Sequence, residues 1–300
     1  MEDYSDIVRE VTTPMIMETV FHKQLNELEQ YAIVDRTVTG GEKITIPIRA
    51  AVSSNAAAYT RSDVDPASGT MTVVDATFTK DYYHTSWEVS GLDLAQAQAG
   101  GQPAISNLIA DAALMEMNQL EAVIYDAIMT DWKLHIDAST AYSDASLNRS
   151  TYATLASTEE NTNTALTPTI MRTHSHTVRL NKLCGPKSGF QFLMESAVLY
   201  GVGPKISALH GWDVPSTLGA KDLGYQPMRS FEGQAVVSPQ GMTTGDVLYG
   251  RKQDFQVRYH MPLSIEQVPS GRHSAKFVAR IGINGLVINP GFCGKMTSKD

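Results

Sequence analysis

The sequence predicts an α+β fold with a long extended hairpin, one long helix and a group of C-terminal strands. Ile44, Ile46 and Ile48 recur at every second residue, which is the spacing of one face of a β-strand. Residues 103–133 instead repeat apolar residues on one broad side of a helix, and residues 255–288 return to strand alternation. These segments, in this order, indicate a mixed fold rather than an all-helical or all-β one.

Residues 7–34 predict an N-terminal arm that contains a helix, with Pro14 at the first helical turn. The apolar residues of the arm follow mixed spacings of three and four: Ile16, Val20, Phe21, Leu25 and Leu28. This apolar stripe is thin, so we expect the arm to lie on another protein surface.

The hairpin follows the arm. Pro47 has no backbone N–H to donate, so its strand is predicted at the edge of a sheet. Residues 51–69 are small and polar and close with a turn sequence at 65–69, which predicts a loop at the hairpin tip. The chain returns as a strand from Met71 to Thr79. Residues that favour strands continue the pattern: Tyr83, Thr85, Trp87 and Val89.

The predicted length of this hairpin has a consequence for its surroundings. An arm of about 15 residues at roughly 3.3 Å each extends about 50 Å. A compact chain of this length has a radius of gyration of about 19 Å, so its diameter is also about 50 Å. We therefore expect the hairpin to lie across its own subunit or to reach another one.

Residues 103–133 predict one helix of roughly 45 Å, with Pro103 in its first turn. Its acidic residues fall five apart and therefore turn around the helix instead of gathering on one face. Glu116 falls near the middle of the apolar side. We favour a solvated Glu116 over an intersubunit ion pair by about two to one, because exposed ion pairs contribute little.

Residues 137–167 predict an irregular connection that ends at Thr167-Pro168, a helix-start signal. A helix is expected from there to Leu183, where Gly185-Pro186 stops it. Residues 190–193 predict a short strand and residues 195–200 a helical turn. A stretch rich in Gly and Pro, residues 201–245, precedes the C-terminal strands.

The C-terminal strands carry alternating apolar residues in residues 255–265 and 277–283. Asn284-Gly285 is a dipeptide favoured in two-residue hairpin turns. The sequence therefore predicts a tight turn there, with Leu286-Val287-Ile288 as the returning strand and Asn289-Pro290 as its end.

The charge and composition of the chain indicate which kinds of partner it can bind. The formal net charge is −8 and no basic run occurs, whereas phosphate binding requires clustered Lys and Arg. We expect any nucleic acid to be enclosed rather than read by sequence. The sequence contains neither a secretory signal nor an 18-residue apolar run, so we expect no membrane. Two cysteines, Cys184 and Cys293, fit a reducing compartment.

Few residues suggest catalysis or metal binding. His174 and His176 lie two apart in a predicted helix and would point about 200° away from each other, so ordinary polar histidines are favoured over a metal site by about nine to one. Residues 63–69 lack the glycine and glutamate positions of a calcium loop. Cys184 is interpreted as a buried thiol rather than a nucleophile. We predict no catalytic residue, no cofactor and no metal.

Several motifs resemble a known family when they are taken together with the order of the elements. They are Trp87 to Asp93 (WEVSGLD), Val247 to Phe255 (VLYGRKQDF), Leu263 to Glu266 (LSIE), Arg280 to Gly285 (RIGING) and Asn289 to Phe292 (NPGF). With them, the chain resembles the tailed-phage major capsid protein family, which has the HK97-like fold.

The resemblance implies five regions. Residues 1–35 would form the N-arm, residues 36–92 an extended β-hairpin called the E-loop, and residues 93–165 a peripheral domain with a long spine helix. Residues 166–266 would form the axial domain, and the C-terminal strands in residues 267–300 would return to the peripheral domain.

By the same resemblance, the chain would assemble with itself into hexamers and pentamers of an icosahedral shell that encloses double-stranded DNA, with the E-loop on a neighbouring subunit. It would be located in the virion, after assembly in the host cytoplasm with a portal and, because the arm starts close to Met1, a separate scaffolding protein or none. Candidate contacts between subunits are Lys43, Arg49, Arg61, Asp63 and Glu116. We predict no covalent crosslink.

Two alternatives remain open at this stage. The first is an encapsulin-like compartment of the same fold that packages enzymes instead of a genome. The second is a soluble metal- or thiol-dependent enzyme that would use His174, His176 or Cys184.

Overall fold

The structure of the protein is a computed structural model. It describes residues 22–37, 42–52, 71–90, 102–136, 159–161, 169–173, 175, 190–196, 230–231, 234–270, 274–288 and 293–297.

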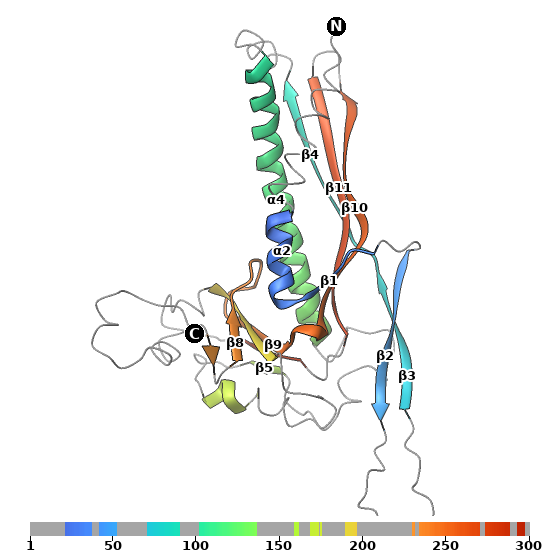
Figure 1. Ribbon diagram of the computed structural model, residues 1–300, viewed down its shortest axis with the longest axis vertical. Coiled ribbons are helices and arrows are strands. Elements are labelled where there is room, and N and C mark those ends of the chain that lie inside the picture. The colour runs from blue at the N-terminus through green and yellow to red at the C-terminus, as the bar shows by residue number, and fades with distance from the viewer. Residues whose placement is uncertain are drawn as a thin grey trace, which may run out of the picture.

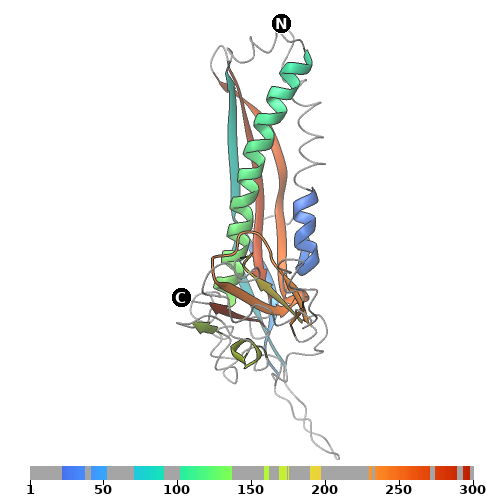
Figure 2. The same cartoon turned by 90° about the vertical axis from the view of Figure 1, so that its left-hand side faces the viewer.

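A long four-stranded sheet lies against one long helix, and together they give the molecule its elongated form (Figures 1 and 2). The strands lie in the order β1 (Ile33–Asp35), β10 (Phe255–Ser270), β11 (Ser274–Val287) and β4 (Tyr82–Ser90). β11 pairs antiparallel with both β10 and β4, whereas the short β1 pairs parallel with β10. The sheet therefore joins strands from both ends of the chain.

The helix α4, Gln102–Ile136, confirms the helix predicted at residues 103–133. Pro103 lies in its first turn, where a missing N–H is harmless. Lys133 and His135 lie in its last turn, and a cationic lysine is favoured there by the helix dipole. None of the described helices combines the length and apolarity needed to cross a bilayer.

A second, six-stranded sheet lies at one end of α4 (Figure 1). Its strands lie in the order β5 (Glu159–Asn161), β12 (Gly294–Thr297), β9 (Asp246–Arg251), β6 (Phe190–Met194), β8 (Gln234–Val237) and β7 (Ser230–Phe231). β6 confirms the strand predicted at residues 190–193, whereas β5, β7, β8, β9 and β12 were not predicted. A short 3-10 helix, Lys252–Asp254, links β9 of this sheet to β10 of the long sheet.

The predicted hairpin is also present. β2, Lys43–Val52, pairs antiparallel with β3, Met71–Thr79, in a separate two-stranded sheet that projects away from the other elements (Figures 1 and 2). Contrary to the continuous pattern expected after Thr79, β4 leaves the hairpin and joins the long sheet. The tip was predicted at residues 51–69, but Ala51 and Val52 continue β2, and residues 53–69 lie outside the described residues.

The main core lies between α4 and the long sheet. Trp132 is fully buried at its centre, with Tyr31 of α2 (His22–Tyr31) edge-on at 6.3 Å and Phe255 at 5.1 Å between ring centroids. Its Nε1 donates a hydrogen bond to the carbonyl oxygen of Gln256 at 3.1 Å. Leu28 on the same short helix is fully buried, which confirms that the arm helix lies on another surface.

The hairpin turn predicted at Asn284-Gly285 is wrong. Both residues lie inside β11, where Asn284 is opposite Arg258 and Gly285 is opposite Val257, and the pairing continues to Val287. The pairing of β10 with β11 instead ends at Ser270 and Ser274, and residues 271–273 lie outside the described residues. The preference of Asn-Gly for turns is local, and here contacts with distant parts of the chain determine its conformation.

The expected regions and the observed sheets do not coincide everywhere. Residue 266, expected as a boundary, lies inside β10. β5, which precedes the expected boundary at 165, lies in the six-stranded sheet, and so does β12, which follows β11. The helix predicted from Thr167 is observed at residues 169–173 and 175. Its remainder, the N-terminal half of the arm and most of the predicted turn at 195–200 lie outside the described residues.

Candidate assembly interface

The base of the hairpin is fixed by both apolar and polar contacts. Ile44 and Phe78, opposite each other in β2 and β3, are 4% and 7% exposed. The Phe78 ring lies 4.9 Å from that of His135 on α4. Burial lowers the pKa of His135 to about 4, and its Nδ1 accepts a hydrogen bond from the Val287 N–H at 3.2 Å. A neutral His135 therefore joins the hairpin base to the last residue of β11.

Asn284 connects β11 to the short segment between β3 and β4. Its Nδ2 donates to the carbonyl oxygen of Thr79 at 3.2 Å and to Asp81 Oδ2 at 2.5 Å. Its Oδ1 accepts a hydrogen bond from the Asp81 N–H at 3.1 Å. Asn284 is only 4% exposed, and burying its amide is tolerable because both ends of the amide are paired.

Gly285, the next residue, lies against α4. Its N–H donates to Asp131 Oδ2 at 3.1 Å. A Cβ at this position would lie 2.8 Å from the Ile128 carbonyl oxygen and 3.0 Å from Ile128 Cα, so only glycine fits. Burial, with a smaller contribution from the charge of Asp81, raises the pKa of Asp131 to about 7, although the Gly285 N–H acts in the opposite direction.

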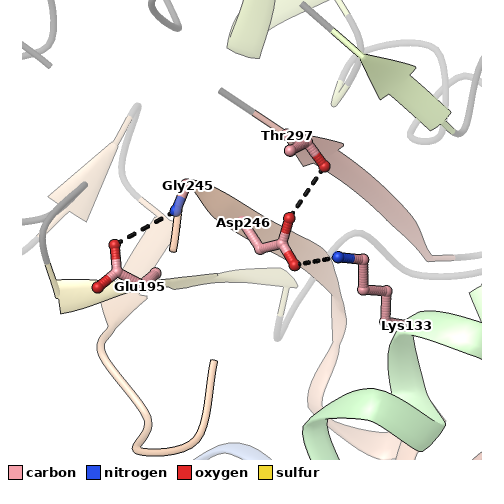
Figure 3. A network of polar contacts seen from close by, with 5 residues as sticks. All are labelled: Lys133, Glu195, Gly245, Asp246 and Thr297. Atoms are coloured by element: carbon pink, nitrogen blue, oxygen red, sulfur yellow. Dashed lines mark hydrogen bonds and ion pairs between the residues drawn. The ribbon is translucent and has the colours of Figure 1, made fainter. Parts of the chain in front are cut away.

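A polar network connects α4 to the six-stranded sheet (Figure 3). Lys133 Nζ lies 2.5 Å from Asp246 Oδ2, and Thr297 Oγ1 donates to Asp246 Oδ1 at 2.9 Å. Nearby, Glu195 Oε2 accepts a hydrogen bond from the Gly245 N–H at 3.4 Å. Asp246 thus joins the helix, β9 and β12 at one buried carboxylate.

The outer side of α4 carries exposed apolar side chains. Met115 is 66% exposed and Val123 54%, and Leu114 and Leu134 are exposed as well. Hollows of about 320 and 350 Å³ lie on either side of Val123, one toward Tyr82 on β4 and one toward Gly241. Met115, Val123 and Leu134 are well separated along the helix, and single exposed apolar side chains of this kind are common on protein surfaces.

Glu121 lies on α4 and is unusually placed for a carboxylate. It is 3% exposed, and neither of its oxygens has a hydrogen-bond partner. Burial, reinforced by the charge of Glu27 on α2, raises the pKa of Glu121 to about 7. Ionisation of Glu121 is therefore less favourable in the folded chain than in water.

Comparisons with known proteins show a similar fold in solved structures but little similarity in sequence. No protein-family model matches the chain, and no curated protein matches it. The capsid of a native GTA particle matches with a TM-score of 0.57 and 12% identity, covering 91% of this chain and 90% of that chain. A virus-like particle from Pyrococcus furiosus matches with a TM-score of 0.54 and 11% identity over 98% and 99%.

The capsid of the cyanophage P-SCSP1u matches with a TM-score of 0.53 and 13% identity, covering 89% of this chain and 86% of that chain. The chain has a phage capsid fold. The resemblance to the tailed-phage major capsid protein family with the HK97-like fold is confirmed at the level of the fold, and identities this low establish no more than that.

Within this capsid fold, the candidate contact residues are not gathered at one place. Lys43 is exposed at the base of β2, and Arg49 lies further along the same strand, opposite Val73. Glu116 is half-buried and accepts a hydrogen bond from Thr85 Oγ1 at 2.8 Å, so a contact inside the subunit uses its carboxylate. Arg61 and Asp63 lie outside the described residues. A role between subunits stays a prediction for all five.

Most of the residues considered for metal binding or catalysis lie outside the part of the chain that the structure describes. His174, His176 and Cys184 lie outside the described residues, and Cys293 is buried. Among the residues that the structure does describe, no three His, Cys, Asp or Glu side chains form a metal-binding group. No sequence pattern indicated the pair of Lys133 with Asp246, and the turn preference of Asn-Gly pointed to a turn that Asn284 does not make.

Proposed function

We propose that the chain is the major capsid protein of a tailed double-stranded DNA phage and builds the hexamers and pentamers of an icosahedral shell around the genome. One observation carries the proposal. In a chain with a capsid fold, the strands β2 and β3 pair only with each other within the described residues and project from the subunit. Exposed strand edges gain by pairing with another chain.

The proposed regions follow the observed sheets. The segment before β1 would be the N-arm, the β2–β3 hairpin the E-loop, and α4 the spine helix. The long sheet with α4 would form the peripheral domain. The six-stranded sheet would form the axial domain, and the chain would pass from the axial to the peripheral domain at the 3-10 helix Lys252–Asp254 and return with β12.

The proposed shell encloses DNA without reading its sequence. The net charge of −8 favours containment over tight phosphate binding, because like charges repel the phosphate backbone. The proposed location is the virion, after assembly in the host cytoplasm with a portal and, where one is encoded, a scaffolding protein. The function assigns no catalytic role to any residue.

A second candidate function is a compartment shell with protein cargo, as in encapsulins. The similarity to the virus-like particle from Pyrococcus furiosus, with a TM-score of 0.54, is the observation in its favour. The contents of the particles distinguish the two functions. Particles purified from the cells that naturally make them should hold nuclease-protected DNA if they are phage capsids and protein cargo if they are compartments.

Electron microscopy tests the shared part of both proposals. The chain is expressed with any scaffolding protein encoded beside it, and the product is imaged in negative stain. We expect closed shells, rings or sheets. A stable monomer under every salt and concentration condition would contradict both shell functions.

A further inference from the structure

We propose that Asn284 is a positioning residue that sets the direction in which the β2–β3 hairpin leaves the subunit, through its hydrogen bonds to Thr79 and Asp81. The part of this inference that concerns the shell rests on the proposed function. If the hairpin contacts a neighbouring subunit, its direction sets the angle at which two subunits join.

The geometry shows why this one side chain can fix a direction. β3 ends at Thr79 and β4 begins at Tyr82, so only Lys80 and Asp81 separate the hairpin from the long sheet. A link of two residues can turn about its backbone dihedrals unless other contacts prevent it. Asn284 holds the link at both ends, at the Thr79 carbonyl oxygen and at the Asp81 N–H.

Backbone contacts support the same link. The Lys80 N–H donates to the Glu42 carbonyl oxygen at 3.3 Å, just before β2. The Ile283 N–H donates to the Asp81 carbonyl oxygen at 3.2 Å. The link is thus tied to β11 by two consecutive residues, Ile283 through its backbone and Asn284 through its side chain.

Asn284 is itself held in place by its surroundings, as a positioning residue requires. It lies inside a paired strand, and its neighbours Ile283 and Leu286 are buried. Gly285 is pressed against the backbone of α4 at Ile128. Apolar packing of Phe78 and Ile44 adds attraction at the hairpin base, but such packing is not directional. Hydrogen bonds are directional, so Asn284 contributes the orientation.

The network also requires the chemistry of asparagine. The Thr79 carbonyl and the Asp81 carboxylate both accept hydrogen bonds, whereas the Asp81 backbone N–H donates one. A single amide group supplies two donors and one acceptor. Aspartate would place a second carboxylate against Asp81, and alanine would remove all three hydrogen bonds to these partly buried partners.

The test uses a donor–acceptor exchange. In Asn284→Asp, the two carboxylates repel each other and both Nδ2 bonds are lost. Asp81→Asn alone keeps an acceptor for Asn284 and serves as the matched control. In the double variant N284D/D81N, the new amide donates to the new carboxylate, so the contact returns with its polarity reversed. A fourth variant, Asp81→Ala, removes only the hydrogen bond from Asn284 Nδ2 to the Asp81 carboxylate. Because it keeps the other two bonds, it can still be measured if N284D does not fold.

Direction is measured as a distance in the unassembled subunit. Spin labels on an unnatural amino acid at Ala51 in β2 and at Asn118 on the exposed side of α4 leave both cysteines unchanged. Double electron–electron resonance should show one narrow distance distribution in the wild type and in D81N. We expect a distribution at least twice as broad in N284D and a smaller broadening in D81A. N284D/D81N should recover part of the narrow distribution, because it restores the contact with residue 81 but not the bond to the Thr79 carbonyl oxygen.

The thermal midpoint of each variant separates positioning from stability. A variant that keeps a wild-type midpoint and a broadened distribution supports the proposal. Distributions that stay narrow in every folded variant, D81A included, would overturn it. Failure of the wild type to form shells, with the distances behaving as expected, would reject the proposed function and leave the positioning role of Asn284 in place.

Discussion

Lys133 on α4 and Asp246 at the start of β9 form an ion pair with 2.5 Å between Nζ and Oδ2. Asp246 is 3% exposed, so removing its positive partner leaves a charge in a poorly solvated place. We expect Lys133→Met to lower the free energy of unfolding by about 2–3 kcal/mol. Urea denaturation followed by circular dichroism measures the loss.

The double variant K133M/D246N is the control for this pair. Because the amide that replaces the Asp246 carboxylate carries no charge, it needs no counter-ion, and the double variant should be more stable than K133M alone. If K133M and D246N destabilise additively, with a coupling below about 0.3 kcal/mol, the ion pair does not hold the six-stranded sheet on the helix.

Gly285→Ala should destabilise the subunit by about 2 kcal/mol, because its new methyl group would press on the backbone of α4 at Ile128. A helix backbone cannot give way as a flexible side chain can. Thermal unfolding measures the effect as a lowered midpoint. Ser264→Ala on the neighbouring strand is the control and should change stability by less than about 0.5 kcal/mol. Equal midpoints for the two variants would show that α4 does not approach β11 this closely.

Glu121 predicts a pH dependence of stability with a definite sign. Its pKa is about 7 in the folded chain and near 4.5 when exposed, so the folded state binds more protons between these values. Stability therefore falls as pH rises from about 4.5 to 7 and stays lower above that. Glu121→Gln removes this contribution and should be more stable than the wild type by about 2–3 kcal/mol at pH 8, with little difference near pH 4.5.

Chemical denaturation at a series of pH values tests the Glu121 prediction. Asp131, with a raised pKa, and His135, with a lowered one, act in the same pH range with opposite signs, so the wild type must be compared with each variant at every pH. Asp126→Asn, on the exposed side of the same helix, controls for the loss of a carboxylate. A stability difference between wild type and E121Q that is constant with pH would contradict the prediction.

Deletion of residues 51–69 should leave the subunit folded but impair shell formation, because the buried residues that the structure describes between α4 and the long sheet come from other segments. The thermal midpoint should stay within a few degrees of the wild type, while electron microscopy should show few closed particles. A Gly/Ser segment of the same length is the matched control for loop length. Normal shells from the deletion variant would show that the hairpin tip is not needed for assembly.

Replacement of His174, His176 and Cys184 together by Ala tests the enzyme alternative. Under the proposed function, the triple variant should form particles as the wild type does, because no chemistry depends on these residues. Particle yield by sedimentation is the measurement. Loss of a thiol- or metal-dependent activity in the triple variant, with the wild type active as a monomer, would favour the enzyme.

Sequence patterns predicted the long elements well and the polar contacts poorly. α4 and the alternating strands around Phe255 and Phe277 bury whole sides of regular elements, so their periodicity is visible in the sequence. The six-stranded sheet joins short segments from distant parts of the chain, and strands as short as Ser230–Phe231 have no detectable period. Asn284 was wrongly assigned to a turn because its hydrogen-bond partners, Thr79 and Asp81, are far from it in the sequence. They lie close to it only in the folded chain.

The pairing of Val34 with Val257, and of β4 with β11, also has a consequence for how the protein is made. At about 5–20 residues per second, a ribosome would need on the order of 10–40 s to proceed from β4 to the end of β11. During that time, the apolar side of α4 lacks β10 and β11, the two central strands of the sheet that covers it. A subunit can therefore complete its fold only near the end of synthesis. Chains that stop early should be captured by chaperones instead of joining the proposed shell.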